Sequence, residues 1–250
     1  MPRLKKKHWI PGLIVLLTTL GFLMDGGVAR VRGQHYEQFI TRTPLPEGNT
    51  LVIGFLGGRE HWNNERLNGR RLALKLRALN LPGVHVETAE NMRRDVVLEL
   101  VRNAFDRNRD GMLDAQERSH VRLIIYGQSF GGAAVVKLAN QLHEMEVPVL
   151  LTVQVDSVGL NDGTIPSNVA RAANLYQANG LVIRGQPEIH AADAMKTIIL
   201  GNWRYDYSHK EIDLSLVPWY RKAFRTAHIK MDNDPEVWAR VESLILQELR

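Results

Sequence analysis

The segment 121–139 limits the possible folds more than any other part of this sequence. An apolar, largely β-branched run at 123–126 leads into Gly-Gln-Ser-Phe-Gly at 127–131, which fits the pattern G-x-S-x-G. Small and apolar residues then recur at the spacing of one buried helix face, at Ala133, Val136 and Leu138. The segment therefore predicts a strand, a sharp turn and a helix in this order, with Ser129 in the turn.

This turn has a chemical consequence. A serine in such a position is held in a strained backbone conformation, with its hydroxyl exposed above the sheet. Gly127 and Gly131 leave room for the strand and the helix to pass closely. The backbone N–H of Phe130, at the start of the helix, would point at an oxyanion formed at Ser129. Ser129 is therefore the candidate nucleophile.

With this motif the sequence resembles the α/β-hydrolase family, in its lipase and esterase-like branch, over roughly residues 50–250. The resemblance implies a doubly wound, mostly parallel sheet with helices on both faces. It also implies a catalytic triad in the chain order serine, acid, histidine, which Ser129, Asp156 and His228 match. The second oxyanion N–H would come from the end of the apolar strand at 51–58, from Leu56 or Gly57.

Two of these assignments have rivals in the sequence. Asp156 ends the predicted strand 147–156, one strand earlier than is usual for the acid of this family, and Asp162 and Asp206 are lesser candidates. His228 stands in the predicted loop before the last helix, where the family has its histidine. The rival base is His209.

The resemblance implies hydrolysis of a carboxylic ester or thioester through an acyl-enzyme, with a small-molecule or lipid-like ester as substrate. Two other functions fit the same features. One is an acyltransferase that uses the same serine. The other is a non-catalytic calcium-binding envelope protein on a hydrolase fold, since a fold does not determine a function.

The segment 106–117 matches the twelve-residue calcium loop of EF-hand proteins. Oxygen-bearing side chains occupy the ligand positions, with the carbonyl of Met112 at position seven and a glycine at the sharp turn: Asp106, Asn108, Asp110, Gly111, Asp114 and Glu117. Only three residues separate Glu117 from the next strand, so a full exiting helix has little room. The pattern therefore predicts one calcium ion with a structural function.

Composition excludes some chemistry. The chain has 250 residues, enough for one large α/β domain, and no cysteine, so disulfides and thiol catalysis are excluded. Its net charge is +5, and the basic residues beyond the N-terminus are interleaved with acids. They form no stripe of the kind that binds nucleic acid.

Hydrophobic periodicity predicts the remaining elements. Helices are expected over 65–79 and 93–105, and a strand over 83–87. A final helix begins at Pro235, with Asp234 as its N-cap. Residues 185–220 show no clean period, and their aromatic residues suit a lid, an acyl-binding wall or a plain surface: Trp203, Tyr205, Tyr207, Trp219 and Tyr220.

The first 29 residues resemble a targeting segment. A basic stretch precedes an apolar run at 9–24, and small residues follow at 26–29. This pattern predicts a cleaved signal peptide or an uncleaved N-terminal anchor that associates with the membrane through 9–24. Either one places the globular part outside the cytoplasm, as a periplasmic, extracellular or membrane-anchored protein. Residues 30–49 are polar and read as a connector.

We predict that the mature protein begins near Arg30 if the segment is cleaved, because Gly27 and Ala29 supply the small residues that a signal peptidase needs. N-terminal sequencing of the exported protein measures this. Full-length chain in the membrane fraction would favour the anchor, and full-length soluble chain in the cytoplasm would exclude both.

Overall fold

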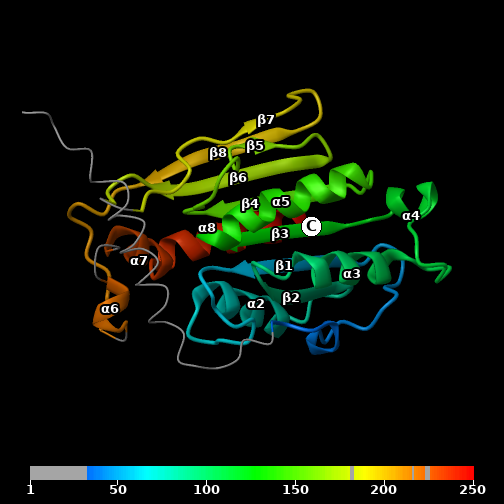
Figure 1. Cartoon of the computed structure of the whole chain (residues 1–250), viewed down its shortest axis with the longest axis horizontal. Helices are drawn as coiled ribbons and strands as arrows, with labels where there is room; N and C mark the ends of the chain where they lie inside the picture. The colour runs from blue at the N-terminus through cyan, green and yellow to red at the C-terminus, as the bar shows by residue number, and fades with distance from the viewer. Residues whose placement is uncertain (1–32, 181–182, 216, 223–225) are drawn as a thin grey trace, which may run out of the picture.

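The structure is a computed structural model that describes residues 33–180, 183–215, 217–222 and 226–250 (Figure 1). The predicted targeting segment, 1–29, lies outside the described residues, so export stays a prediction. Within the described residues, no helix is both long enough and apolar enough to span a membrane.

Six of the described strands form one sheet, in which every neighbouring pair is parallel. Its spatial order is β2 (Val84–Glu90), β1 (Thr50–Leu56), β3 (Leu123–Gln128), β4 (Val149–Val155), β6 (Val169–Gln177) and β8 (Ile198–Tyr205). Two short strands, β5 (Thr164–Ile165) and β7 (His190–Ala191), pair separately. The strand that carries the serine motif, β3, lies between β1 and β4.

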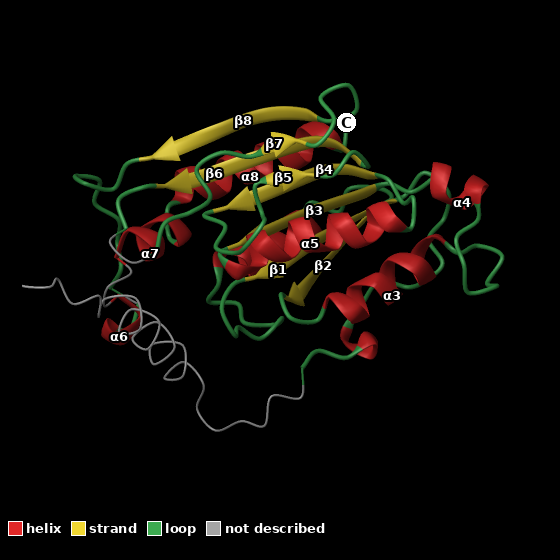
Figure 2. Cartoon of the chain, turned by 45° about the horizontal axis from the view of Figure 1, so that its top comes forward, coloured by secondary structure: helices red, strands yellow, loops and turns green. Residues whose placement is uncertain are grey.

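Helices cover both faces of the sheet (Figure 2). On one face α3 (Arg94–Phe105) and α5 (Phe130–Glu144) share a core with Ile53 and Ile125 of the central strands. On the other, α2 (Asn68–Ala78) and α8 (Pro235–Glu248) share a core with Val52 and Ile124. Consecutive residues of a strand point to opposite faces of the sheet, so Val52 and Ile53, like Ile124 and Ile125, belong to two separate cores. This doubly wound parallel arrangement confirms the predicted α/β-hydrolase-type fold.

The remaining described helices are short. They are η1 (Tyr36–Gln38), α4 (Ala115–Ser119), α6 (Trp219–Lys222) and α7 (Thr226–Asp232). In Figure 1 the carboxyl ends of the strands lie on the left, beside α7, and α4 lies at the opposite end. The sheet therefore has a serine end and, opposite it, an end formed by α4 and the loop 106–117.

Two strands of the sheet, β6 and β8, were not predicted. The buried residues of β6 include Ala172 and Ala173, which are poor strand formers, and both faces are covered, so no alternating pattern marks the segment. The edge strand β8 leaves Ile198 and Leu200 exposed, which removes the usual contrast between apolar and polar positions.

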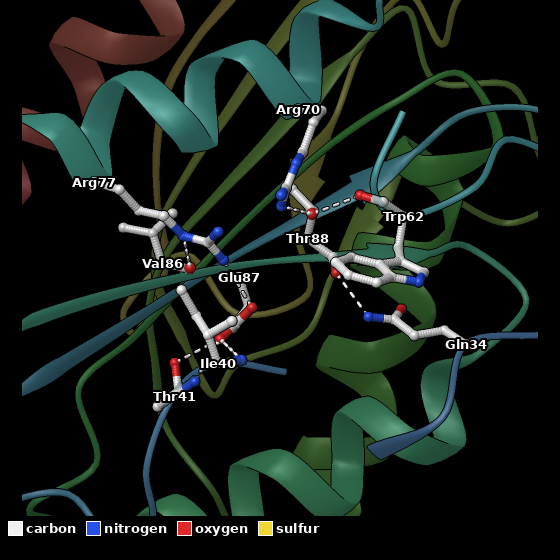
Figure 3. A network of polar contacts seen from close by, with 9 residues as sticks. All are labelled: Gln34, Ile40, Thr41, Trp62, Arg70, Arg77, Val86, Glu87 and Thr88. Atoms are coloured by element: carbon white, nitrogen blue, oxygen red, sulfur yellow. Dashed lines mark hydrogen bonds and ion pairs between the residues drawn. The ribbon is translucent and has the colours of Figure 1, made fainter. Parts of the chain in front are cut away.

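The segment 33–49 packs along β2, the other edge of the sheet (Figure 3). The side-chain amide of Gln34 makes the two hydrogen bonds to β2 that the backbone of an adjacent strand would make. Its Nε2 donates to the Thr88 carbonyl at 3.0 Å, and its Oε1 accepts from the Glu90 N–H at 3.2 Å. Phe39 and Leu45 of the same segment join the core on the α3 side. The edge is thereby covered, as edge strands generally are in soluble proteins.

A buried carboxylate on β2 fastens this segment. Glu87 Oε1 accepts from the backbone N–H groups of Ile40 and Thr41, at 2.8 and 2.7 Å, and from the Thr41 hydroxyl at 2.8 Å. Its Oε2 accepts from Arg77 Nη2 of α2 at 2.8 Å (Figure 3). The predicted connector thus includes a stretch bound tightly to the domain.

We predict that Glu87→Ala lowers the free energy of unfolding by about 3 kcal/mol, because it removes the acceptor of two partly buried N–H groups and of a largely buried guanidinium. Urea unfolding measures the loss. The control is Asp95→Ala, whose carboxylate is 65% exposed and pairs with Arg93, and which should cost less than about 1 kcal/mol. Equal losses in the two variants would show that the network does not anchor the segment.

Candidate active site

Ser129 stands at the junction of β3 and α5, where it occupies the N-cap position of the helix with φ 57° and ψ −123°. A residue with a side chain adopts this conformation only at a cost of about 1–3 kcal/mol, which the surrounding structure must offset. Its N–H donates to the Val155 carbonyl at 2.9 Å, and its carbonyl accepts from the Val158 N–H at 3.1 Å. The neighbouring strand β4 and the loop after it therefore hold the turn.

The two glycines of the motif are required by close backbone contact. A Cβ on Gly127 would collide with the backbone carbonyl of Gly131, and a Cβ on Gly131 would collide with the carbonyl of Phe55 in β1. The start of α5 thus packs directly on the ends of β1 and β3. Any larger residue at either position would displace the helix that carries Ser129.

The structure brings Ser129, Asp156 and His228 together. His228 Nε2 lies 3.0 Å from Ser129 Oγ, and His228 Nδ1 lies 2.6 Å from Asp156 Oδ2. All three side chains are buried. An ionised carboxylate only accepts, so Nδ1–H donates to Asp156, and in the neutral ring Nε2 is left to accept the Ser129 hydroxyl proton. His228 lies within α7, where the sequence predicted a loop, because the chain makes a further helical segment before α8.

Asp156 follows β4 and is fixed by a residue that the sequence did not predict. Gln177, at the end of β6, donates from its backbone N–H to Oδ1 at 3.2 Å and from its side-chain Nε2 to Oδ2 at 3.1 Å. Both side chains have no exposed surface. A Cβ on Gly185 would collide with the Asp156 carboxylate, so this residue also keeps space for the acid. Only the pairing of β4 with β6 brings Gln177 to this place.

The rival candidates lie elsewhere. The Asp162 carboxylate accepts from the Ser157 hydroxyl at 2.5 Å. The Asp206 carboxylate accepts from the Ser208 N–H and from Asn179, and these hydrogen bonds lower its pKa. His209 is exposed in the loop after β8. Among the described hydrogen bonds, the partner of the Ser129 hydroxyl is His228 Nε2, which accepts from it.

The two oxyanion candidates flank Ser129. Phe130 opens α5, and Leu56 is the last residue of β1. The next residue, Gly57, comes so close that a Cβ on it would lie 3.1 Å from the Cβ of Ser129. Asn91, which the sequence did not single out, donates from Nδ2 to the carbonyls of Leu56 and Gly58 at 2.9 and 2.6 Å. Asn91 therefore fixes the segment of Leu56 and Gly57, the two candidates for the second oxyanion donor.

Part of the aromatic group at 203–220 is structural. Tyr205 and Tyr207 are buried, and the Tyr207 hydroxyl donates to Asp234 Oδ2 at 2.8 Å. Burial, with the hydrogen bond to this carboxylate, raises the pKa of Tyr207, so it stays protonated at neutral pH. Trp219 is 78% exposed. Of these residues, Tyr205 and Tyr207 therefore serve the core.

The segment 106–117 runs from the end of α3 into the first turn of α4, at the opposite end of the sheet from Ser129 (Figure 1). Its carboxylates accept hydrogen bonds from the loop's own backbone: Asp106 Oδ2 from Gly111 N–H at 2.8 Å, Glu117 Oε1 from Arg107 N–H at 2.8 Å, and Asp114 Oδ1 from Glu117 N–H at 2.8 Å. In the described part of the chain, no group of three or more His, Cys, Asp or Glu side chains is gathered to hold a metal ion. The exiting helix α4 is short, as the sequence predicted.

The sheet order and the grouping of these three side chains define the fold class of the protein. It is an α/β-hydrolase-type domain in which a serine, a histidine and an aspartate meet beside the carboxyl ends of the strands. No protein-family model matches the sequence, and no curated protein sequence matches it.

Solved structures with a similar backbone trace include a cutinase-like protein from Cryptococcus sp. Its sequence identity to this chain is 16% and the TM-score is 0.44, and the match covers 83% of this chain and 98% of the other. Dienelactone hydrolase from Anabaena variabilis has 13% identity and a TM-score of 0.38 over 80% of this chain and 86% of its own. Esterase B from Lactobacillus rhamnosis, inhibited by a tributyrin phosphonate, has 11% identity and a TM-score of 0.38, covering 98% and 96%.

Proposed function

We propose that the protein is a serine hydrolase that cleaves a carboxylic ester or thioester through an acyl-enzyme. One observation carries the proposal: a buried chain of hydrogen bonds runs from Ser129 Oγ through both nitrogens of His228 to Asp156. A serine is a weak nucleophile until a base removes its proton, and this geometry supplies that base together with the acid that orients it.

Each of the three residues has a separate task in this mechanism. His228 Nε2 takes the hydroxyl proton as Ser129 Oγ attacks the substrate carbonyl carbon, and it then gives that proton to the leaving oxygen or sulfur. Asp156 holds the ring in the required tautomer and stabilises the imidazolium. A water molecule, activated by the same nitrogen, then hydrolyses the acyl-enzyme and restores Ser129.

The negative charge that develops on the carbonyl oxygen needs donors. The Phe130 N–H at the positive end of α5 supplies one, and the N–H of Leu56 or Gly57 supplies the second. Such a donor typically contributes about 10²–10³ in rate. Asn91 supports this function because it holds the carbonyls on both sides of Gly57 in place.

We predict that Ser129→Ala abolishes hydrolysis of p-nitrophenyl esters, while His228→Ala lowers kcat by several orders of magnitude, because base and nucleophile act as one unit. His209→Ala is the control and should keep nearly full activity. The measurement is release of p-nitrophenol, with labelling by a fluorophosphonate as a second readout.

The outcomes separate the alternatives. Wild-type turnover in Ser129→Ala would exclude the nucleophile, and a larger loss in His209→Ala than in His228→Ala would move the base. A protein that neither hydrolyses esters nor reacts with the fluorophosphonate would favour the non-catalytic binding protein. Ester products formed with added alcohols, in excess over free acid, would favour the acyltransferase.

We further propose that the loop 106–117 binds one calcium ion that stabilises the fold. Its donors are all oxygens, the chemistry that calcium prefers: the side chains of Asp106, Asn108, Asp110, Asp114 and Glu117 and the carbonyl of Met112. The Asp106 carboxylate already accepts hydrogen bonds from the N–H groups of Asp110 and Gly111, and these hydrogen bonds close the sharp turn at Gly111. The loop lies far from Ser129, so the ion takes no part in the reaction.

We predict that EDTA lowers the melting temperature and that calcium restores it better than magnesium. At a free concentration of about 100 times the dissociation constant, a ligand adds roughly 2.7 kcal/mol to the stability of the native state. Glu117→Gln should lose most of this calcium response. Glu47→Gln, which removes an exposed carboxylate outside the loop that pairs with Arg107 of the loop, should keep it. A melting temperature that ignores both EDTA and calcium would refute the site.

A further inference from the structure

A groove of about 450 Å³ opens beside the candidate oxyanion site. Its floor is the first two turns of α5, from Phe130 to Lys137. One wall is the loop 158–160 after β4, and the other is the turn 91–94 between β2 and α3. Of the residues that line the groove, Phe130 and Asn91 have functions assigned above, and the others have none.

Both walls are hydrogen-bonded to the reacting end of the molecule. The Val158 N–H donates to the carbonyl of Ser129 at 3.1 Å, and Asn91 Nδ2 donates to the carbonyls of Leu56 and Gly58. The groove therefore adjoins the backbone of the turn at Ser129 and the loop that Asn91 holds, and Phe130, the next residue after Ser129, lines its near end. A substrate held at Ser129 can extend from there along α5.

The groove is lined by exposed apolar side chains. Met92 is 74% exposed, Leu160 is 83% exposed and Phe130 is 36% exposed, and Ala133 and Ala134 leave the helix surface between them low. An apolar chain of a substrate lying there would cover side chains that are otherwise left in water, at a gain of about 25 cal/mol per Å² of buried apolar surface.

The charge in the groove has one sign. Among the described residues that line it, Arg94 and Lys137 are cationic, and none is acidic. Arg94 donates from Nη1 to the Asn91 carbonyl at 3.1 Å, while its Nε is buried without a hydrogen-bond partner among the described atoms. Lys137 is exposed. The positive end of the α5 dipole adds to this potential.

From these observations we infer that the groove binds the anionic, apolar chain of an ester or thioester substrate, an inference that rests on the proposed function. Lys137 is eight residues after Ser129, or about 12 Å along the helix axis. The substrate class is therefore an ester whose carbonyl is followed by an aliphatic chain of roughly seven to ten bonds and then by a carboxylate or another anion. The chain lies on Phe130, Met92 and Leu160, and the anion pairs with Arg94 and Lys137.

The test compares two substrates of equal length. They are the p-nitrophenyl monoester of suberic acid, which carries a free carboxylate, and the same compound with that carboxylate methylated. Wild-type protein should hydrolyse the anionic ester with a kcat/KM about tenfold higher, and added salt should reduce this preference because the pairing groups are partly exposed. A second pair carries the anion on the alcohol side of the ester instead of the acyl side. Its members are 8-acetoxyoctanoate and methyl 8-acetoxyoctanoate, and the release of acetic acid measures their hydrolysis.

The variants locate the preference. Arg94→Gln and Lys137→Gln should each lower the preference, measured as the ratio of kcat/KM for the anionic ester to that for its neutral partner, about threefold, and together about tenfold. Lys196→Gln removes the same charge from an exposed position before β8 and should leave the preference unchanged.

Failure of this inference differs from failure of the proposed function. Fluorophosphonates with a carboxylate-ended and a methyl-ester-ended chain measure reaction at Ser129 even where no ester in the panel is turned over. Faster labelling by the anionic probe, slowed in Lys137→Gln and Arg94→Gln, supports the inference. Equal labelling, with an equal kcat/KM for both members of both ester pairs, overturns it and leaves the hydrolase intact. No labelling by either probe refutes the proposed function, and the inference with it.

Discussion

The contact between the start of α5 and the ends of β1 and β3 is the constraint on which the site depends. Because Gly131 lies against the Phe55 carbonyl and Gly127 lies against Gly131, the chain must reverse within one residue at Ser129. That reversal requires the uncommon backbone conformation of Ser129, and hydrogen bonds to Val155 and Val158 hold it there. The same packing brings Gly57 beside the serine. The side chain of Ser129, the start of α5 and the loop at Gly57 are thus arranged by one backbone contact.

Local sequence predicted much of the fold. The strands β1, β3 and β4 are continuous apolar runs, as strands covered on both faces usually are, and α3, α5 and α8 show helical spacing. The strands β6 and β8 left no such signal, because the first is rich in alanine and the second lies exposed at the edge. These two segments are recognised as strands from their pairing, of β6 with β4 and of β8 with β6, rather than from their own residues.

The site divides in the same way. Ser129, Asp156 and His228 were selected from a motif, a strand end and a position before the last helix, and the structure brings these residues into hydrogen-bond distance. Gln177 and Asn91 were not selected, because each acts on a residue far away in the sequence and neither belongs to a motif. The helical placement of His228 was also missed, since the short α7 lacks a full period of apolar residues.

The position of the loop 106–117 separates it from Ser129. It meets β3 at the amino end, and Ser129 follows the carboxyl end, so the six residues of β3 set the two about 20 Å apart. Between them lies the buried strand β3, which is hydrogen-bonded on both sides. A perturbation of the loop therefore reaches Ser129 along this strand only if the strand's hydrogen bonds to both of its neighbours change as well.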